Sequence, residues 1–421
     1  MARRISSVFL AILVTLPVAA ATRMTYEVNG VPTPIEWVPT AFPLRYEIDD
    51  RVAGLHPNAV AMIDRAFSAW AMVPGANVRF ESRGVVTNAR SSDTDRVVIS
   101  LADDLLAGQG AAAITSYTYD TSTGHLLDSD ISIDPSLFEG GFNAQMALQH
   151  EIGHVLGLDH SAVLSSIMFP YVGEAGTPVE FDSDDRIAIA TMYPKGDPTL
   201  AGATLQGRVV GDHGGIYAAQ VVAVNDTGQP VGTVLTNPSG EFTLAGIPAG
   251  RYRLYAEPLD GPVALDAMQG CWRHADPSAF PTEFFETPVQ VENGKLYGNL
   301  MLNTAGAVQL NPKWIGIVRG ESTEMSLSGS PVDVVPGETI TLAVAGDGFT
   351  SGMTEFEVLN PALRRVSDFE WASNFVRAKY EVRADAQPTS AVVVVRSGRD
   401  LATLTGALRI QRAQRGRVVR K

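Results

Sequence analysis

The stretch "HEIGHVLGLDHS", residues 150–161, holds three of the seven histidines of this 421-residue chain. On a helix His150 and His154 lie four positions apart, so both rings project from one face and can reach one ion. Gly157 can adopt a positive φ, which ends a helix and turns the chain back. That turn lets His160 supply a third imidazole. Three histidines are a common ligand set of catalytic zinc, so the spacing predicts a zinc site.

Glu151 lies one step around the same helix from the first histidine, next to the metal without ligating it. Bound zinc lowers the pKa of its water and polarises a carbonyl group. A neighbouring carboxylate can take the proton from that water and pass it to a leaving amine. A bare H-E-x-x-H can occur by chance on a surface helix, but H-E-x-x-H-x-x-G-x-x-H fixes five positions. The motif therefore predicts zinc-dependent hydrolysis with Glu151 as the general base.

Residues 40–196 around the motif read as a mixed α/β domain. Apolar residues recur at helical spacing in three stretches. The second starts from Asn143, a good N-cap, and the third is begun by acidic residues. These expected helices are residues 56–73, 143–158 and 182–194. Alternation and β-branched content indicate strands at 44–49, 77–82, 95–102 and 125–134.

Beyond residue 200 the pattern changes to short apolar runs separated by Gly, Pro and Asn-Asp turns. This is typical of β-sandwiches, and we expect one over residues 203–303 and another over 306–411. The stretch "PKGDPTL", residues 194–200, reads as an exposed linker. We therefore expect a domain ending near Gly196 to fold and act without the two sandwiches.

The first 21 residues have a cationic start, an apolar run and small residues for cleavage, which predicts a secretory signal peptide. The alternative is an uncleaved membrane anchor, but the apolar run is short for a span. Residues 22–39 form an N-terminal segment of unassigned fold. Cys271 is the only cysteine, so no intramolecular disulfide can form. This usage fits an exported bacterial-type protein.

The net charge of −14 argues against a nucleic-acid partner, which would require clustered Lys and Arg. Basic residues gather only at the end of the chain, in a tail over residues 412–421. We interpret this tail as solvated. After signal removal no other apolar run is long enough to anchor the chain in a membrane.

Residues 40–195 resemble the matrixins, a family of metzincin zinc proteases. "SSIMFPY", residues 165–171, is similar to the Met-turn that follows the zinc motif in metzincins, with Met168 beneath the metal. Ser161, directly after the third histidine, is the matrixin choice at that position. The resemblance implies that Pro170 and Tyr171 line the substrate pocket, and that residues 111–120 form an edge strand beside which substrate binds.

The chain also departs from the matrixin pattern. No cysteine precedes the zinc motif, so a thiol-bearing propeptide is unsupported, and Pro170 and Tyr171 lack their usual spacer residue. His125 is the only histidine in the region where animal relatives hold a structural zinc, which makes that second zinc unlikely. Three carboxylates are candidates for calcium, with a solvated strand edge as the alternative. They belong to Asp128, Asp130 and Asp134.

Residues 203–303 resemble carboxypeptidase regulatory-like sandwiches, and residues 306–411 look Ig-like or IPT-like on pattern alone. Together these resemblances imply a secreted zinc endopeptidase that hydrolyses extracellular proteins or peptides. A different interpretation is a surface binding protein, in which the sandwiches attach to a cell-surface or glycan target and the metzincin domain is inactive. Peptidoglycan-type or toxin-type specificity with the same chemistry is a third.

Overall fold

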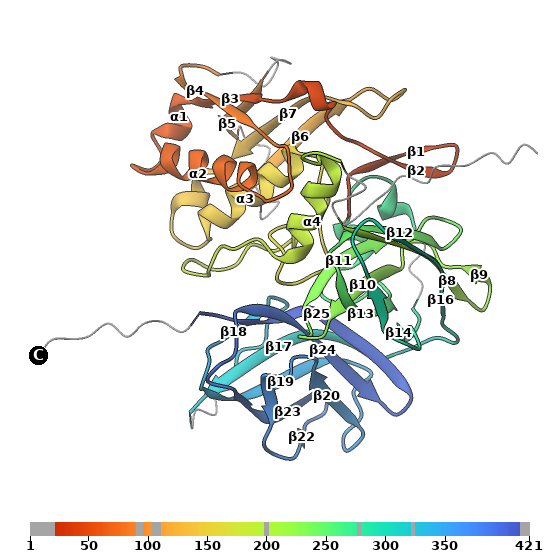
Figure 1. Cartoon of the computed structure of the whole chain (residues 1–421). Helices are drawn as coiled ribbons and strands as arrows, with labels where there is room; N and C mark the ends of the chain where they lie inside the picture. The colour runs from red at the N-terminus through yellow and green to blue at the C-terminus, as the bar shows by residue number, and fades with distance from the viewer. Residues whose placement is uncertain are drawn as a thin grey trace, which may run out of the picture.

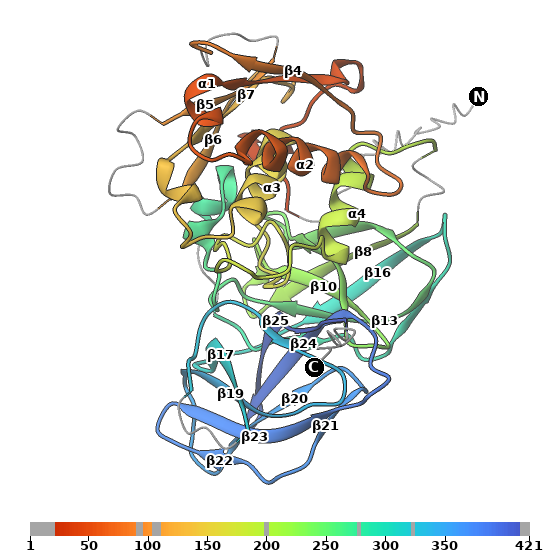
Figure 2. The ribbon, with the colours of Figure 1, turned by 90° about the vertical axis from the view of Figure 1, so that its left-hand side faces the viewer.

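The computed structural model describes residues 22–89, 96–102, 111–197, 202–275, 279–320 and 325–412. The expected signal peptide lies outside these residues, as does the expected basic tail apart from Arg412. The chain forms three parts that follow one another from top to bottom in Figure 1 and again in Figure 2. We call them the first module (residues 22–197), the second module (202–303) and the third module (306–412).

The first module is built on a five-stranded mixed sheet in the order β4-β3-β5-β7-β6. Its strands are β3 (Leu44–Asp49), β4 (Phe80–Val86), β5 (Val97–Leu101), β6 (Ala113–Tyr119) and β7 (Leu126–Ile133). Neighbouring strands are parallel except β6, which runs antiparallel to β7 and forms one edge of the sheet. Each expected strand is present, including the edge strand within residues 111–120, but the strand expected at 77–82 begins later, at Phe80, and runs to Val86.

The helices of the first module are α1 (Asp50–Ala53), α2 (Ala59–Ala71), α3 (Ala144–Val155) and α4 (Ser183–Met192), with short 3₁₀ turns at Pro39–Ala41 and Pro135–Phe138. Helix α2 buries Ile63, Phe67 and Trp70 in the core that it shares with α3. Helix α3 begins where expected, because the Asn143 side chain accepts from the backbone N–H of Met146 at 3.1 Å.

Helix α4 begins with a capping box. The Asp182 side chain accepts backbone N–H groups of the first turn, and the Asp185 side chain accepts the N–H of Asp182 at 2.7 Å. Both aspartates are buried, so the start of α4 lies in the interior of the protein and not on its surface.

The N-terminal segment forms a hairpin of β1 (Thr25–Val28) and β2 (Val31–Pro34). It is tied to the end of the zinc motif, since the N–H of Met24 donates to the carbonyl of Gly157 at 3.0 Å. Met24 and Ile35 bury their side chains with Leu126 in a small apolar cluster. The segment is therefore a packed part of the first module.

The second module is a sandwich of two sheets, β11-β10-β13-β14 with β15 on β13, and β12-β8-β16 with β9 on β8. Its strands are β8 (Ala203–Gly211), β9 (Gly214–Gly215), β10 (Gln220–Asn225), β11 (Pro230–Leu235), β12 (Glu241–Ile247), β13 (Gly250–Glu257), β14 (Glu283–Phe284), β15 (Val289–Val291) and β16 (Leu296–Asn303). A long connection from β13 to β14 carries two 3₁₀ helices, η5 (Leu265–Ala267) and η6 (Gly270–His274).

The third module is also a two-sheet sandwich, β17-β19-β23-β21 with β22 on β23, facing β18-β25-β24-β20. Its strands are β17 (Asn311–Arg319), β18 (Val332–Val334), β19 (Thr339–Asp347), β20 (Thr354–Val358), β21 (Leu363–Arg365), β22 (Glu370–Trp371), β23 (Phe375–Val382), β24 (Thr389–Ser397) and β25 (Asp400–Ile410). The expected class, an α+β domain followed by all-β modules, is confirmed.

The three modules pack against one another, although Lys195, Gly196 and Asp197 of the expected linker are exposed and its residues 198–200 lie outside the described residues. Ile187 of α4 belongs to the apolar core of the second module. Leu164 and Phe169, which follow the zinc motif, pack into an apolar core formed by residues of the second and third modules. No helix in the described residues has the length and apolar character needed to cross a membrane.

A substitution of Trp70 can test how much the contact between α2 and the zinc helix α3 contributes to stability. The Trp70 ring is fully buried, and its indole N–H donates to the carbonyl of Gln149 on α3 at 2.8 Å. We expect Trp70→Ala to lower the free energy of unfolding by about 3–5 kcal/mol, because it leaves a large cavity. Denaturant unfolding followed by circular dichroism measures this. Met72→Ala, at the 75% exposed C-cap of the same helix, is the matched control and should change this free energy little. Equal effects of the two substitutions would contradict the prediction.

Candidate zinc site

The three histidines of the motif converge as the spacing predicts. The Nε2 atom of His154 lies 3.1 Å from Nε2 of His150 and 3.3 Å from Nε2 of His160. Tetrahedral zinc with bonds of roughly 2.0–2.1 Å places neighbouring nitrogens about 3.3–3.4 Å apart. The donor atoms therefore fit one zinc ion. In the described residues this is the one group of three or more His, Cys, Asp or Glu side chains with metal-binding proximity.

Each of the three rings is held by a backbone carbonyl on its other nitrogen. Nδ1 of His150 contacts the carbonyl of Ile167 at 2.8 Å, and Nδ1 of His154 contacts that of Leu158 at 2.8 Å. Nδ1 of His160 contacts the carbonyl of Ala267, in the second module. A carbonyl only accepts, so each Nδ1 carries the hydrogen and each Nε2 presents its lone pair to the metal.

Burial keeps these rings neutral. It lowers the pKa of His150 to about 4, and burial together with the neighbouring His150 lowers that of His160 to about 4. The pKa of His154 is lowered further below its usual range, by burial and by the two adjacent rings. Neutral imidazole is the form that binds zinc, so the site is prepared for metal at neutral pH.

Glu151 lies beside the three histidines with its carboxylate anchored by the edge strand. The hydroxyl of Thr115 on β6 donates to Oε2 of Glu151 at 2.7 Å and to its backbone carbonyl at 3.0 Å. Burial raises the pKa of Glu151 to about 7, and the Thr115 hydroxyl opposes this rise. A carboxyl with this pKa can both take up and release a proton near neutral pH.

Gly157 and Met168 have the structural roles that the motif implies. Gly157 has φ of +94°, and a Cβ there would lie 2.6 Å from the carbonyl oxygen of Ile35. Met168 is buried under α3, where a Cβ on Gly153 would lie 2.2 Å from its sulfur. Gly157 is thus required to turn the chain, and Gly153 leaves room for Met168 to pack beneath the helix.

The Met-turn is held by the first turn of α4. The Asp185 carboxylate accepts from the Ser166 hydroxyl and from the N–H of Ile167 at 3.0 Å. Ser161 donates its hydroxyl to Asp184 at 2.9 Å and its N–H to the carbonyl of Met168 at 2.9 Å. These bonds fix the third histidine to the Met-turn, a role for Ser161 that the sequence did not reveal.

Pro170 and Tyr171 follow the Met-turn and lie partly at the surface, with Tyr171 57% exposed. Tyr171 lines a pocket of about 330 Å³. The opposite wall of this pocket comes from the third module, including Ile315 and Ile317. That Pro170 and Tyr171 line the substrate pocket remains a prediction from the resemblance. The third module lies next to these two residues.

The carboxylates considered for calcium have partners within the protein. Asp130 is buried and accepts from the N–H of Val98 at 2.8 Å. Asp134 accepts from the N–H of Ser136 at 2.9 Å and caps a 3₁₀ turn. Asp128 lies opposite Thr118 in the pairing of β7 with β6. These contacts favour structural roles for Asp130 within β7 and for Asp134 directly after it.

Comparison with known proteins agrees with this geometry. Residues 36–194 match the family model described as Matrixin. The first module is a matrixin domain. The matrixins are zinc metalloendopeptidases, and the three converging histidines lie within the matched residues, in an arrangement consistent with a catalytic zinc site. Residues 204–260 match the carboxypeptidase regulatory-like domain. Both resemblances inferred from the motifs are therefore confirmed.

Three relatives illustrate the range of the similarity. The hatching enzyme of Paracentrotus lividus is 28% identical over 175 residues, which cover 39% of this chain and 28% of that protein. Karilysin of Tannerella forsythia is 38% identical over 58 residues, covering 14% of this chain and 12% of karilysin. Matrilysin of Rattus norvegicus is 40% identical over 58 residues, covering 14% and 22%. The chain thus spans less than a third of the length of each.

The low pKa values of the ligands predict the pH dependence of zinc binding by the matrixin domain. Protons compete with zinc only when the pH approaches the pKa of the ligands. We expect the zinc dissociation constant to stay nearly constant as the pH falls from roughly 7.5 to 5 and to rise steeply toward pH 4, because the pKa of His150 and of His160 is about 4. Equilibrium dialysis against buffered zinc measures this. A steep loss beginning near pH 6.5, the usual histidine value, would contradict it.

Proposed function

We propose that this chain is a secreted zinc-dependent endopeptidase that hydrolyses peptide bonds of extracellular proteins. The observation that supports this most is the convergence of three Nε2 atoms at 3.1 and 3.3 Å beside an anchored glutamate. His150, His154 and His160 would hold the zinc. When bound, the metal polarises the scissile carbonyl and acidifies a water molecule.

Glu151 is the proposed general base. Thr115 occupies its Oε2 atom, and among the described residues no donor contacts Oε1. Oε1 is therefore the oxygen free to accept a proton from the attacking water and to deliver it to the leaving amine. Burial raises the pKa of Glu151 to about 7. At neutral pH its carboxyl group can therefore both accept the proton from water and release it to the amine at little cost in free energy.

An extended substrate would bind along β6. This strand forms an edge of the sheet and packs against the zinc helix α3, so its outer backbone groups lie beside the catalytic residues. A peptide that adds as a further strand gains main-chain hydrogen bonds regardless of its sequence. Such binding would place the scissile bond near Glu151, whose partner Thr115 is itself in β6.

Export is supported by the sequence of residues 1–21, which has the parts of a signal peptide. Protein substrates are the inference from the matrixin domain. The alternative, a surface binding protein with an inactive metzincin domain, would be favoured by bound zinc without proteolysis.

The decisive experiment combines zinc analysis with cleavage of casein by the purified chain and by Glu151→Gln. We expect one zinc per chain in both proteins, because Glu151 is not a ligand. The variant should lose turnover by about 10²–10⁴-fold or more, since an amide cannot accept the proton. Wild-type protein that binds zinc but cleaves nothing would contradict the proposal. Equal rates for the two proteins would remove Glu151 from its role.

Thr115→Val tests how the base is tuned. Valine keeps the shape but removes the hydroxyl that stabilises the carboxylate, so the pKa of Glu151 should rise above its value of about 7. Activity requires the carboxylate form, so the acid limb of the pH–kcat/KM profile should move to higher pH. Thr118→Val, on an exposed position of the same strand, is the control and should leave the profile in place. An unchanged profile for Thr115→Val would contradict this tuning.

A further inference from the structure

The third zinc ligand lies on an irregular segment, residues 158–168, which we call the return loop. His150 and His154 are fixed by helix α3, whereas His160 has no helix or strand of its own. The carbonyls that orient the first two rings belong to the first module, at Ile167 and Leu158. The carbonyl that orients His160 belongs to the second module.

The connection from β13 to β14 reaches the return loop through consecutive backbone groups. The Ala267 carbonyl accepts from Nδ1 of His160. Two residues later, the N–H of Gln269 donates to both oxygens of Asp159, at 3.0 and 3.1 Å. Asp159 is buried and its Oδ1 also accepts the N–H of His160 at 2.7 Å. The second module thus contacts both the ring and, through Asp159, the backbone of His160.

A strand of the same module, β11, supports the residue after His160. Thr233 of β11 donates its N–H and its hydroxyl to Oδ1 of Asp184, at 2.9 and 3.0 Å. The other oxygen of Asp184 accepts the Ser161 hydroxyl at 2.9 Å. All three residues are buried, so these bonds are shielded from water and cost free energy to break.

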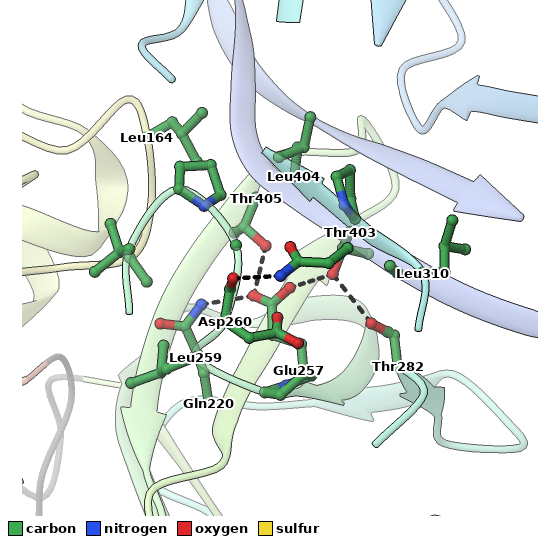
Figure 3. Close-up of a pocket in the computed structure, with 18 of the residues that line it drawn as sticks. Leu164, Gln220, Glu257, Leu259, Asp260, Thr282, Leu310, Thr403, Leu404 and Thr405 are labelled. Atoms are coloured by element: carbon green, nitrogen blue, oxygen red, sulfur yellow. Dashed lines mark hydrogen bonds between the residues drawn. The ribbon is translucent and has the colours of Figure 1, made fainter. Parts of the chain in front are cut away.

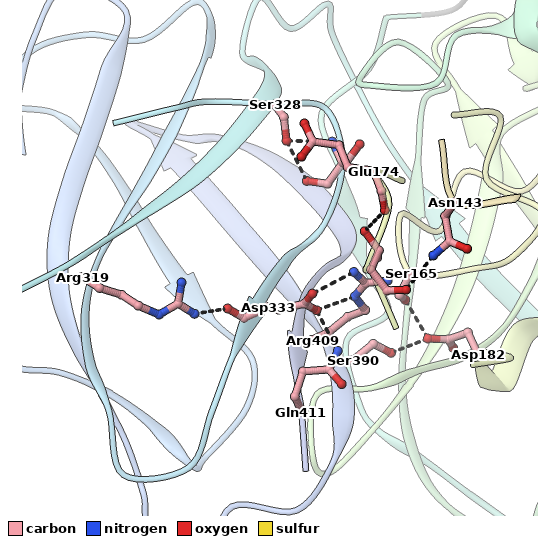
Figure 4. Close-up of polar contacts among 12 residues, drawn as sticks. Asn143, Ser165, Glu174, Asp182, Arg319, Ser328, Asp333, Ser390, Arg409 and Gln411 are labelled. Carbon is pink, nitrogen blue, oxygen red and sulfur yellow. Dashed lines mark hydrogen bonds and ion pairs between the residues drawn. The ribbon is translucent and has the colours of Figure 1, made fainter. Parts of the chain in front are cut away.

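The third module holds the next part of the return loop. The carbonyl of Thr405 on β25 accepts the N–H of Leu164 at 2.8 Å. Asp182 accepts the hydroxyl of Ser165 at 2.6 Å and that of Ser390 on β24 at 2.7 Å, as Figure 4 shows. Gly406 approaches so closely that a Cβ there would lie 2.5 Å from the Ser165 hydroxyl.

Thr405 also joins the two sandwiches. Its hydroxyl donates to the buried Glu257 of β13 at 2.7 Å, and Gln220 donates to the same oxygen at 2.6 Å, as seen in Figure 3. Thr403 donates to the other oxygen of Glu257. The second module, the third module and the return loop therefore meet at one strand, β25.

We propose that the two β-sandwich modules are positioning elements of the zinc site. The second module holds His160 through the backbone of residues 267–269, and the third module holds the return loop that carries His160. Their proposed action is on the position of the third ligand, and neither module supplies a zinc ligand. Outer-shell partners of this kind typically change metal affinity by about 10–100-fold. The inference rests on zinc binding by the three histidines, part of the proposed function, and is independent of whether the chain cleaves proteins.

This inference reverses the expectation drawn from the linker composition, that the first module would act alone. Without the sandwiches the His160 ring would lose its Nδ1 partner, and Asp159 would lose both bonds from Gln269. A free ring on an irregular loop samples several rotamers, so the third ligand would be available for only part of the time.

Gly270→Ala in the full chain separates the β13–β14 connection from the first module. Gly270 has φ of +58°, and a Cβ there would lie 1.9 Å from the carbonyl oxygen of Thr25 on β1, so η6 must move away. Gly306→Ala is the matched control, since Gly306 has φ of +79° but open space around it. Zinc release into excess EDTA is followed with a metallochromic dye.

We expect zinc release from Gly270→Ala to be about 10–100-fold faster than from wild type, with Gly306→Ala close to wild type. The visible spectrum of the cobalt-substituted protein should also change in Gly270→Ala alone, because it reports the ligand geometry. Release and spectrum equal to wild type in a zinc-loaded Gly270→Ala protein would overturn the proposal.

Asp159 supplies a second pair of variants, which decides the question if Gly270→Ala does not fold. Asp159→Ala removes the acceptor shared by His160 and Gln269, whereas Asp159→Asn keeps one oxygen in place. We expect fast zinc release for Asp159→Ala and rescue by Asp159→Asn. Equal release by both variants and wild type would overturn the proposal, whereas wild-type protein without zinc would instead overturn the proposed function.

Discussion

The hydrogen bond that orients the His160 ring is the constraint on which the site depends most. Helix α3 carries two of the three histidines, but a catalytic zinc commonly has three protein ligands. Regular structure ends at Val155, so the nitrogen of the third ligand must be placed by contacts from elsewhere. The structure supplies them on every side: Asp159 on the backbone, Ser161 toward α4, and Ala267 on the ring. The geometry of the three histidines consequently depends on the second module as well as on the first.

The start of α4 forms hydrogen bonds to several of the segments that surround the three histidines. Three aspartates there are buried, and each bonds to two segments. Asp182 bonds to the return loop and to β24, and Asp184 bonds to the return loop and to β11. Asp185 bonds to the Met-turn and to the first residue of the capping box. Burial raises the pKa of Asp184 to about 6 and that of Asp185 to about 7. Hydroxyl and N–H donors, together with the positive end of the helix dipole, favour the charged forms and offset part of that cost.

Much of the site could be predicted from the sequence, because its signals are local. The histidine spacing, Gly157 and Asn143 each act within a few residues of one another, and local geometry then fixes their roles. The contact of Thr115 with Glu151 could not be predicted. A threonine is common in an alternating strand, and its role becomes visible only when helix α3 packs across that strand. Ala267 could not be found at all. It acts through its backbone carbonyl, 107 residues from His160, and a carbonyl is present at every position.

The independence of the first module was inferred from the composition of the linker, which describes a connecting segment and not the surfaces that it connects. Helix α4 carried the better signal. Ile187 and Ile189 lie two residues apart, about 200° around a helix, so they point to opposite sides. An amphipathic helix on a domain surface would leave one of those sides polar. Here Ile189 enters the core of the first module and Ile187 that of the second. Apolar residues on both faces indicate a helix buried between two layers, and the second layer available in this chain is the β-sandwich that follows.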